Sequence, residues 1–276
     1  KSRFRELTHL GTEMPCNVLA DEILTPGEGQ VRALINIGGN PVVAFPDQEK
    51  MTRALDSLDL LVSVDIRMAQ TAKRSHVVLA PRMCLERDDI SNLSEWWYEV
   101  PYARYTKALV PPPGELIDEY AMLWGLAKRL GTGLPLAGGP CPMDALPDKA
   151  SFLDLMTAGC TVPPSKVRDD TPDGKAIIYH DLHPRVEAPD PEAANKFQLA
   201  AGDMPSALNT YREAAVAKPG FDYRLVSRRT KHRFNSTGGH LTALKAKRTT
   251  NPAHIHPDDL AALGIEDGAL VSITSP

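Results

Sequence analysis

The chain has 276 residues, 42% of them hydrophobic, and a formal net charge of −4. This length suffices for one large domain or two ordinary ones, and the negative charge argues against a chain devoted to nucleic acid. No apolar run approaches the ~18 residues of a membrane span, and residues 1–20 lack the apolar core of a signal peptide. Four well-separated cysteines predict free thiols in a reducing compartment, the cytoplasm: Cys16, Cys84, Cys141 and Cys160.

The first half of the chain alternates apolar strands with helices. Strands are predicted over 31–37, 60–64 and 77–80, with helices over 47–58 and 69–74 between them. This order is typical of βαβ units, and continuous apolar strands favour a parallel sheet covered on both faces. The expected fold class is therefore α/β, with a parallel sheet and flanking helices.

The first predicted strand runs directly into Gly38, Gly39 and Asn40. Glycines allow a positive φ and a close approach of the backbone to a ligand. A helix is expected to begin near Asp47, since a proline precedes this residue and acids are favoured in a first turn. Strand, glycine loop and helix in this order predict free backbone N–H groups at a helix N-terminus, which suit a phosphate or pyrophosphate.

Asp65 follows the second predicted strand. In dinucleotide-binding folds a carboxylate at this place binds the ribose hydroxyls; the alternative is a solvated loop acid or a helix cap. Thr71, shortly after it, is a hydrogen-bonding candidate for a base or a phosphate.

After residue 80 the predicted elements lie farther apart in the sequence. A helix over 116–130, closed by Gly131, is expected to cover the sheet. A proline-rich connection follows, with short helices over 152–158 and 206–217. The remaining elements predicted for the chain are a strand over 223–227, a short helix that begins at Pro257, and a strand over 269–274.

The segment between Tyr223 and Pro257 contains no acidic residue. Its eight basic residues are Arg224, Arg228, Arg229, Lys231, Arg233, Lys245, Lys247 and Arg248. This excess of positive charge favours an anionic ligand: a nucleotide diphosphate, a pterin phosphate or a nucleic acid. Few aromatic side chains are present to stack the bases of a nucleic acid. The alternative is a solvated basic face.

These residues together resemble the C-terminal part of a molybdopterin oxidoreductase of the dimethyl sulfoxide reductase family. The first block of similarity is RALINIGGNP at 32–41, followed by Asp65, Thr71 and HVVLAP at 76–81. The second block runs from LVSRR at 225–229 through HPDDL and LGIEDG within 256–268. The resemblance implies two molybdopterin guanine dinucleotides on one Mo or W, held by a Rossmann-like domain and a β-barrel of the double-psi type.

The expected cofactor-binding residues are Gly38, Gly39, Asn40, Asp65, Thr71, Arg229, His232, Asn235 and Ser236. The resemblance implies a nucleotide site lined by Gly38, Gly39, Asn40 and Asp65. It also implies that the residues from Arg229 to Ser236 in this set approach the pterin or its phosphates. No catalytic residue or metal ligand is identified. An iron–sulfur cluster, where present, would belong to a part of the parent chain before Lys1.

The expected organisation is a leading segment (1–30), a Rossmann-like domain (31–131), a connection (132–221) and the truncated start of the barrel (222–276). The implied function is that of part of an oxidoreductase, inactive alone, whose partners are a small-molecule substrate, an electron-transfer partner and the rest of the parent chain. No nucleic acid partner and no membrane span are expected. The alternative is a non-enzymatic nucleotide- or polyanion-binding module.

Overall fold

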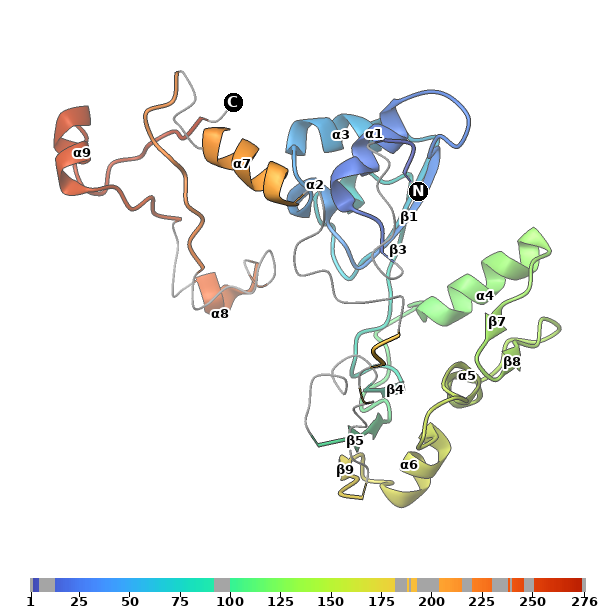
Figure 1. The fold of residues 1–276 in the computed structure, drawn as a ribbon. Coiled ribbons are helices and arrows are strands. Elements are labelled where there is room, and N and C mark those ends of the chain that lie inside the picture. The colour runs from blue at the N-terminus through green and yellow to red at the C-terminus, as the bar shows by residue number, and fades with distance from the viewer. Residues whose placement is uncertain are drawn as a thin grey trace. The chain divides into compact units, whose positions relative to one another are not determined.

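A computed structural model describes residues 2–4, 13–91, 100–181, 188, 190–192, 204–214, 220–229, 238, 240–245 and 251–274. The chain divides into two units, Lys1–Glu187 and Ala188–Pro276. The ribbon of the described residues is drawn in Figure 1. Each unit is described by itself below.

The first unit is built on a three-stranded sheet. Its strands are β1 (Ala33–Ile37), β2 (Leu60–Val64) and β3 (Val77–Leu79), in the order β1-β2-β3 and parallel throughout. Because the strands are parallel, their carboxyl ends meet at one edge of the sheet. The predicted α/β arrangement with a parallel sheet is confirmed, and the three strands fall within one or two residues of their predicted bounds.

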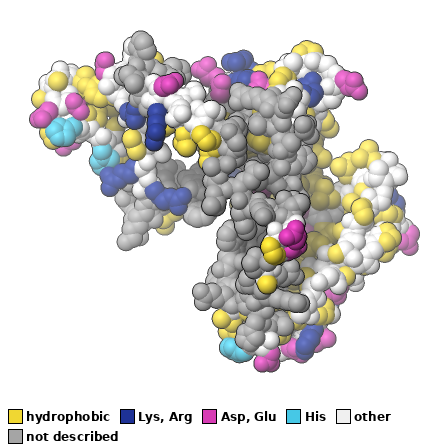
Figure 2. Space-filling model, in the orientation of Figure 1, with side chains coloured by type: hydrophobic (Ala, Val, Ile, Leu, Met, Phe, Trp, Pro, Cys, Tyr) yellow, Lys and Arg dark blue, Asp and Glu magenta, His cyan; other side chains and the backbone are white. Residues whose placement is uncertain are grey.

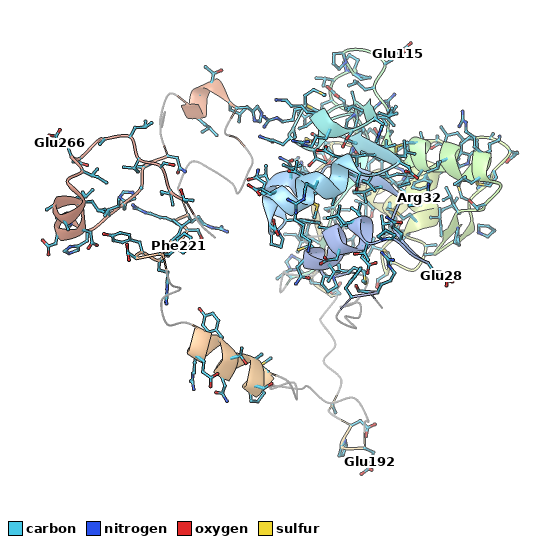
Figure 3. All side chains as sticks on the ribbon, turned by 90° about the horizontal axis from the view of Figure 1, so that it is seen from above. Glu28, Arg32, Glu115, Glu192, Phe221 and Glu266 are labelled. Carbon is cyan, nitrogen blue, oxygen red and sulfur yellow. The ribbon has the colours of Figure 1, made fainter. Side chains whose placement is uncertain are left out.

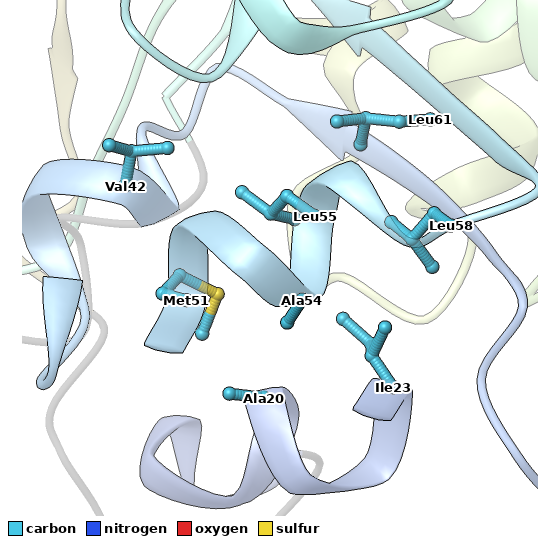
Figure 4. Packing of buried hydrophobic residues seen from close by; sticks show 8 residues of the cluster. All are labelled: Ala20, Ile23, Val42, Met51, Ala54, Leu55, Leu58 and Leu61. Carbon is cyan, nitrogen blue, oxygen red and sulfur yellow. The ribbon is translucent and has the colours of Figure 1, made fainter. Parts of the chain in front are cut away.

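Helices cover one face of this sheet. They are α1 (Leu19–Leu24), which follows the 3-10 turn η1 (Cys16–Val18), then α2 (Pro41–Ala44) and α3 (Gln48–Asp56). The core between the helices and the sheet consists of Ala20, Ile23, Val42, Met51, Ala54, Leu55, Leu58 and Leu61, all buried (Figure 4). Each large side chain buried here contributes about 1.5–3 kcal/mol to folding. The core holds α1 and α3 on the side of the sheet to which Leu61 points.

The predicted helix over 47–58 is confirmed as α3. The Asp47 side chain accepts a hydrogen bond from the Lys50 N–H at 3.0 Å and so caps its N-terminus. Arg32, labelled in Figure 3, precedes β1 and pairs with Asp59, which precedes β2, at the amino-terminal edge of the sheet. The predicted helix over 69–74 is a single 3-10 turn, η2 (Ala72–Arg74).

The other face of the sheet stays partly exposed in the described residues. Ile35, Ile37 and Val77 are 40%, 47% and 43% exposed. The prediction of a sheet covered on both faces is therefore wrong for this part of the chain. Apolar strands indicate that both faces are suited to burial, but they do not specify what covers each face.

The rest of the first unit consists of short elements. They are β4 (Asp89–Ile90), β5 (Tyr102–Ala103), β6 (Tyr105–Thr106), α4 (Glu119–Leu130), β7 (Pro135–Leu136), β8 (Gly139–Pro140), α5 (Lys149–Met156), α6 (Pro164–Asp170) and β9 (Ile177–Ile178). A second small core is formed by the buried side chains of Tyr105, Leu153 and Val167. The predicted short helix over 152–158 corresponds to α5, which begins earlier because Asp148 caps it.

Helix α4 is where the sequence predicts it and ends at Gly131, whose φ of 67° is the left-handed value of a helix C-cap. Its predicted packing is wrong. The Tyr120 ring lies 4.8 Å from the Phe152 ring of α5, while Leu130 at its last turn is 67% exposed. The helix therefore packs against the following α5 segment and does not cover the sheet. An apolar stripe fixes which face packs but not the surface that receives it.

The second unit contains three helices among its described residues: α7 (Met204–Ala214), α8 (Thr242–Lys245) and α9 (Pro257–Leu263). The helix predicted to begin at Pro257 is confirmed as α9, with Gly264 at a φ of 65° as its C-cap. The predicted helix over 206–217 corresponds to α7. Phe221 and Glu266, labelled in Figure 3, belong to this unit.

The two predicted strands of the second unit are wrong. Residues 223–227 and 269–274 are described but belong to no strand, and Leu225, Val226 and Leu270 are exposed. A strand requires a hydrogen-bonded neighbour, and the described residues of this unit provide none. The predicted start of a β-barrel over 222–276 is consequently not seen in the structure.

Glu22 anchors the amino-terminal residues to α1. Its carboxylate accepts hydrogen bonds from Ser2 Oγ at 2.5 Å, Arg3 N at 2.8 Å and Arg3 Nε at 2.7 Å. Burial alone raises the pKa of Glu22, but the hydrogen bonds from Ser2 and Arg3 and the charge of Arg3 outweigh it, so the pKa falls below its ordinary value of 4.5.

This lowered pKa predicts an acid-sensitive fold. A carboxyl group with a lowered folded-state pKa stabilises the fold above its unfolded-state pKa, and this stabilisation is lost as the pH falls through the folded-state value. We expect the free energy of unfolding of the wild type to fall more steeply below pH 4.5 than that of Glu22→Gln. Urea unfolding at a series of pH values measures both slopes; parallel slopes would contradict the assignment.

No helix among the described residues has the length and apolar character needed to cross a bilayer.

Candidate functional site

The carboxyl edge of the sheet brings together the predicted residues of the first unit. The glycine loop follows β1 and Asp65 follows β2, and the two strands stay in register to their ends. The Gly38 N–H donates to the Val64 carbonyl at 2.8 Å, and the Asp65 N–H donates to the Leu79 carbonyl at 3.2 Å. The loops after the three strands are thus tied side by side.

The glycine loop requires both of its glycines. Gly38 has a φ of 65°, a left-handed value that side chains other than glycine rarely adopt. A Cβ at Gly39 would lie 2.7 Å from Asn36 Oδ1, inside contact distance. The loop therefore presents bare backbone at the sheet edge, as a close approach to a ligand requires.

Asn40 connects this loop to the turn after β2. Its Oδ1 accepts from the Thr71 N–H at 3.1 Å and from the Thr71 hydroxyl at 2.9 Å, while its Nδ2 donates to Gln70 Oε1 at 2.9 Å. Thr71 Oγ1 also accepts from the Val42 N–H at 3.2 Å, and Thr71 is fully buried. The structure thus gives Asn40 and Thr71 a role in fixing the shape of the loop.

A buried polar chain supports the loop from below. Asn36 Nδ2 donates to the Gly39 carbonyl at 2.8 Å and lies 3.4 Å from Ser63 Oγ. The Ser63 hydroxyl lies 2.7 Å from that of Ser75, which donates to the Thr71 carbonyl at 3.1 Å. Sequence reasoning missed these residues. The signal was available: Asn36 and Ser63 are polar residues at paired positions of two otherwise apolar strands.

The free backbone donors differ from the predicted ones. The helix after the glycines is the four-residue α2, with Pro41 at its start and the Val42 N–H bound to Thr71. Helix α3, predicted to present its N-terminus here, begins later, at Gln48. Among the described residues no acceptor is recorded for the Gly39 and Asn40 N–H groups. These two adjacent donors are the part of the edge that suits an anionic oxygen.

Asp65 keeps one carboxylate oxygen for a ligand. Its Oδ1 accepts from the Arg67 N–H at 3.1 Å, which fixes the side chain in a local turn. Within the described part of the chain Oδ2 has no recorded partner. A fixed carboxylate with an open oxygen is suited to accept hydrogen bonds from hydroxyl groups.

The predicted residues of the second unit are only partly described. Arg229 is exposed, as are Arg224 and Arg228, and Lys and Arg side chains of this unit appear at the surface in Figure 2. Arg228 Nη1 lies 2.8 Å from His254 Nε2. His232, Asn235 and Ser236 lie outside the described residues.

The described residues contain no group of three or more His, Cys, Asp or Glu side chains arranged to hold a metal ion.

Two family models match the chain, one over each of the two blocks of sequence similarity (32–81 and 225–268). The molybdopterin oxidoreductase model matches residues 13–129, and the molybdopterin dinucleotide binding domain matches residues 223–276. The first match contains the whole sheet edge described above. The second contains the basic segment and α9.

Two curated proteins illustrate the similarity. The trimethylamine-N-oxide reductase of Haemophilus influenzae is 24% identical, over 95% of this chain and 36% of its own length. The F420-dependent formate dehydrogenase subunit alpha of Methanocaldococcus jannaschii is 26% identical, over 92% of this chain and 36% of its own length. The chain therefore spans about a third of the length of these relatives.

Among solved structures, the fold is similar to that of acetylene hydratase from Pelobacter acetylenicus. The TM-score is 0.61 at 19% sequence identity, covering 92% of this chain and 35% of the hydratase chain. At this identity the likeness concerns the fold alone.

Proposed function

Because the chain belongs to the molybdopterin oxidoreductase family, we propose that it forms part of a molybdenum- or tungsten-dependent oxidoreductase and that its sheet edge holds the dinucleotide end of the cofactor. The two family matches confirm the predicted resemblance and the cofactor class, a molybdopterin dinucleotide. When bound, the cofactor supplies the two-electron redox chemistry at its metal. The residues of this chain supply binding and orientation.

The observation that carries the proposal is the pair of N–H groups at Gly39 and Asn40 without a recorded acceptor, at the same sheet edge as Asp65. We assign the N–H groups to phosphate oxygens of the dinucleotide, because hydrogen bonds to charged acceptors are about twice as strong as neutral ones. The Asp65 carboxylate is assigned to ribose hydroxyls. Thr71 acts through Asn40, whose side chain it holds, and is therefore a positioning residue.

The residues at the carboxyl edge of the sheet fit the dinucleotide end of the cofactor. The missing side chains at Gly38 and Gly39 leave the backbone accessible, and a Cβ at Gly38 would meet no atom within 4 Å. No lysine or arginine of the loop itself competes with these donors. The edge therefore binds through backbone donors, which cannot swing away.

The finer organisation stays part of the proposal. We assign residues 31–131 to a Rossmann-like nucleotide domain and residues 222–276 to the start of the dinucleotide-binding barrel, with 1–30 and 132–221 as leading and connecting segments. The match over 223–276 supports the assignment of this segment to dinucleotide binding. Arg229, His232, Asn235 and Ser236 are proposed to approach the pterin or its phosphates. A small-molecule substrate, an electron-transfer partner and a cytoplasmic location complete the proposal.

Metal and pterin analysis of the protein that carries this chain tests the function. We expect Mo or W, with a pterin and a guanine nucleotide released together on acid hydrolysis. A purified protein that binds GDP but contains neither metal nor pterin would leave a non-enzymatic nucleotide-binding module and overturn the oxidoreductase.

A further inference from the structure

The first unit contains a cleft of about 800 Å³ that lies outside the proposed dinucleotide site. One wall is the segment that follows β3, and the other is α4 with the residues just before it. Leu79, Ile117 and Met122 are among its apolar lining residues. Charged side chains line it as well, and polar groups that lie among apolar ones are what orient a small molecule in a site.

Arg82 is a polar group of this kind. Its backbone N–H donates to the Ile117 carbonyl at 2.8 Å, beside the bridge between Pro81 and Ile117, and this holds the residue at the cleft wall. Its Nε is buried, and the structure records no hydrogen-bond acceptor for it. No ion pair of Arg82 is recorded in the described part of the chain either. A buried donor without a partner costs about 1–3 kcal/mol, and more when it is charged.

The other charged groups of the cleft lining are bonded. The pairs are Lys149 with Asp118 (2.8 Å), Arg87 with Glu119 (2.5 Å), Asp88 with the Tyr105 hydroxyl (2.7 Å), Glu86 with the Met83 N–H (2.8 Å) and Arg129 with the Gly125 carbonyl (3.0 Å). Among the described lining residues, Arg82 is thus the charged side chain that lacks a recorded partner. The cleft therefore holds a guanidinium that no described group bonds, beside apolar side chains.

The charge of Arg82 reaches into the cleft. Burial raises the pKa of the Tyr120 hydroxyl, as do the charges of Asp118 and Asp148, whereas the positive charge of Arg82 lowers it. Tyr120 and Arg82 both line the cleft. A negative group placed between the cleft walls would therefore interact with Arg82.

We propose that this cleft binds a small molecule that carries one oxyanion, a carboxylate or a phosphate, on an apolar body. The oxyanion bonds the Arg82 guanidinium, whose planar fork matches both groups, and the apolar body lies against Leu79, Ile117 and Met122. The cleft meets the sheet edge at Leu79 but contains none of the residues assigned to the dinucleotide, so its existence does not depend on the function proposed above.

The test titrates the chain with hexanoate, hexyl phosphate and the uncharged hexanamide. Arginine Nε–H resonances report binding, and the Arg82 signal is assigned by its loss in Arg82→Gln. We expect at least one oxyanion to shift this signal to saturation and hexanamide to bind about tenfold more weakly, because it lacks a charge-assisted bond. The two oxyanions together show whether the cleft selects a carboxylate or a phosphate.

Two variants control the test. Arg53→Gln removes an exposed guanidinium on α3 that does not line the cleft, and it should leave oxyanion binding unchanged. Arg82→Lys keeps the charge without the planar fork, so it should weaken oxyanion binding less than Arg82→Gln does. If Arg82→Gln fails to fold, the affinity of Arg82→Lys is compared with that of the wild type instead. An Arg82 signal that neither oxyanion moves, or equal affinity for hexanoate and hexanamide, would overturn the proposal.

Discussion

Gly39→Ala is expected to lower the affinity of the chain for GDP about hundredfold, the loss of about 3 kcal/mol that follows from losing two charge-assisted hydrogen bonds. The added Cβ would lie 2.7 Å from Asn36 Oδ1. Asn36 is buried, and its Nδ2 is bonded to the Gly39 carbonyl at 2.8 Å. It cannot move away without breaking the polar chain under the loop. The loop must shift, and the Gly39 and Asn40 N–H groups shift with it.

Isothermal titration of wild type and variant with GDP, which carries the diphosphate and guanosine, measures this loss. Gly114→Ala is the matched control, because a Cβ there meets no atom within 4 Å and the backbone needs no left-handed φ. The control should bind GDP as the wild type does. If Gly39→Ala retains wild-type affinity, the loop does not hold the phosphates.

The second large effect concerns Asn40→Ala, which we expect to lower the free energy of unfolding by about 2–4 kcal/mol. The substitution leaves the Thr71 N–H and hydroxyl and Gln70 Oε1 without their partner. Thr71 is fully buried, so water cannot replace the lost bonds, and each unpaired buried group costs about 1–3 kcal/mol. Affinity for GDP should fall as well, because the loop is no longer tied to the turn after β2.

Urea unfolding of Asn40→Ala, Thr71→Val and the double variant measures the stability effect. The two residues share their hydrogen bonds, so the double variant should lose less than the sum of the single losses. Asn40→Asp is the conservative control: it keeps the acceptor for Thr71 and loses only the bond to Gln70. Strictly additive losses would contradict the connection between the two loops.

The elements that sequence predicts correctly are those set by local pattern. Helix α3 is specified by its Asp47 cap and by apolar residues at helical spacing, and α9 by Pro257 and Gly264 at its two ends. The parallel strands follow from short apolar runs between helices. These signals operate within a few residues, and tertiary contacts did not override them.

The errors concern partners that lie far away in the sequence. The stripe of α4 packs against α5 through Tyr120, whereas the sequence favoured the sheet. The apolar runs at 223–227 and 269–274 have strand composition but no neighbouring strand among the described residues. In each case local pattern defines a surface, while the choice of what it contacts depends on the three-dimensional arrangement.

The sequence predicts the residues of the candidate site but not the hydrogen bonds that connect them. Gly38, Gly39, Asn40, Asp65 and Thr71 were each singled out, and the parallel sheet brings them to one edge. Their roles differ: Asn40 and Thr71 bond each other, so the free donors are backbone N–H groups. Hydrogen-bond pairing between distant loops cannot be read from residue spacing, and the same reason hid Asn36 and Ser63.

Nuclear magnetic resonance can show whether the Gly39 and Asn40 N–H groups bind the phosphates of a guanine dinucleotide. GDP is titrated into the nitrogen-15-labelled chain, and backbone amide shifts are followed. We expect the Gly39 and Asn40 amides to shift most and to saturate together. Shifts confined to other segments, with these two amides unmoved, would contradict it.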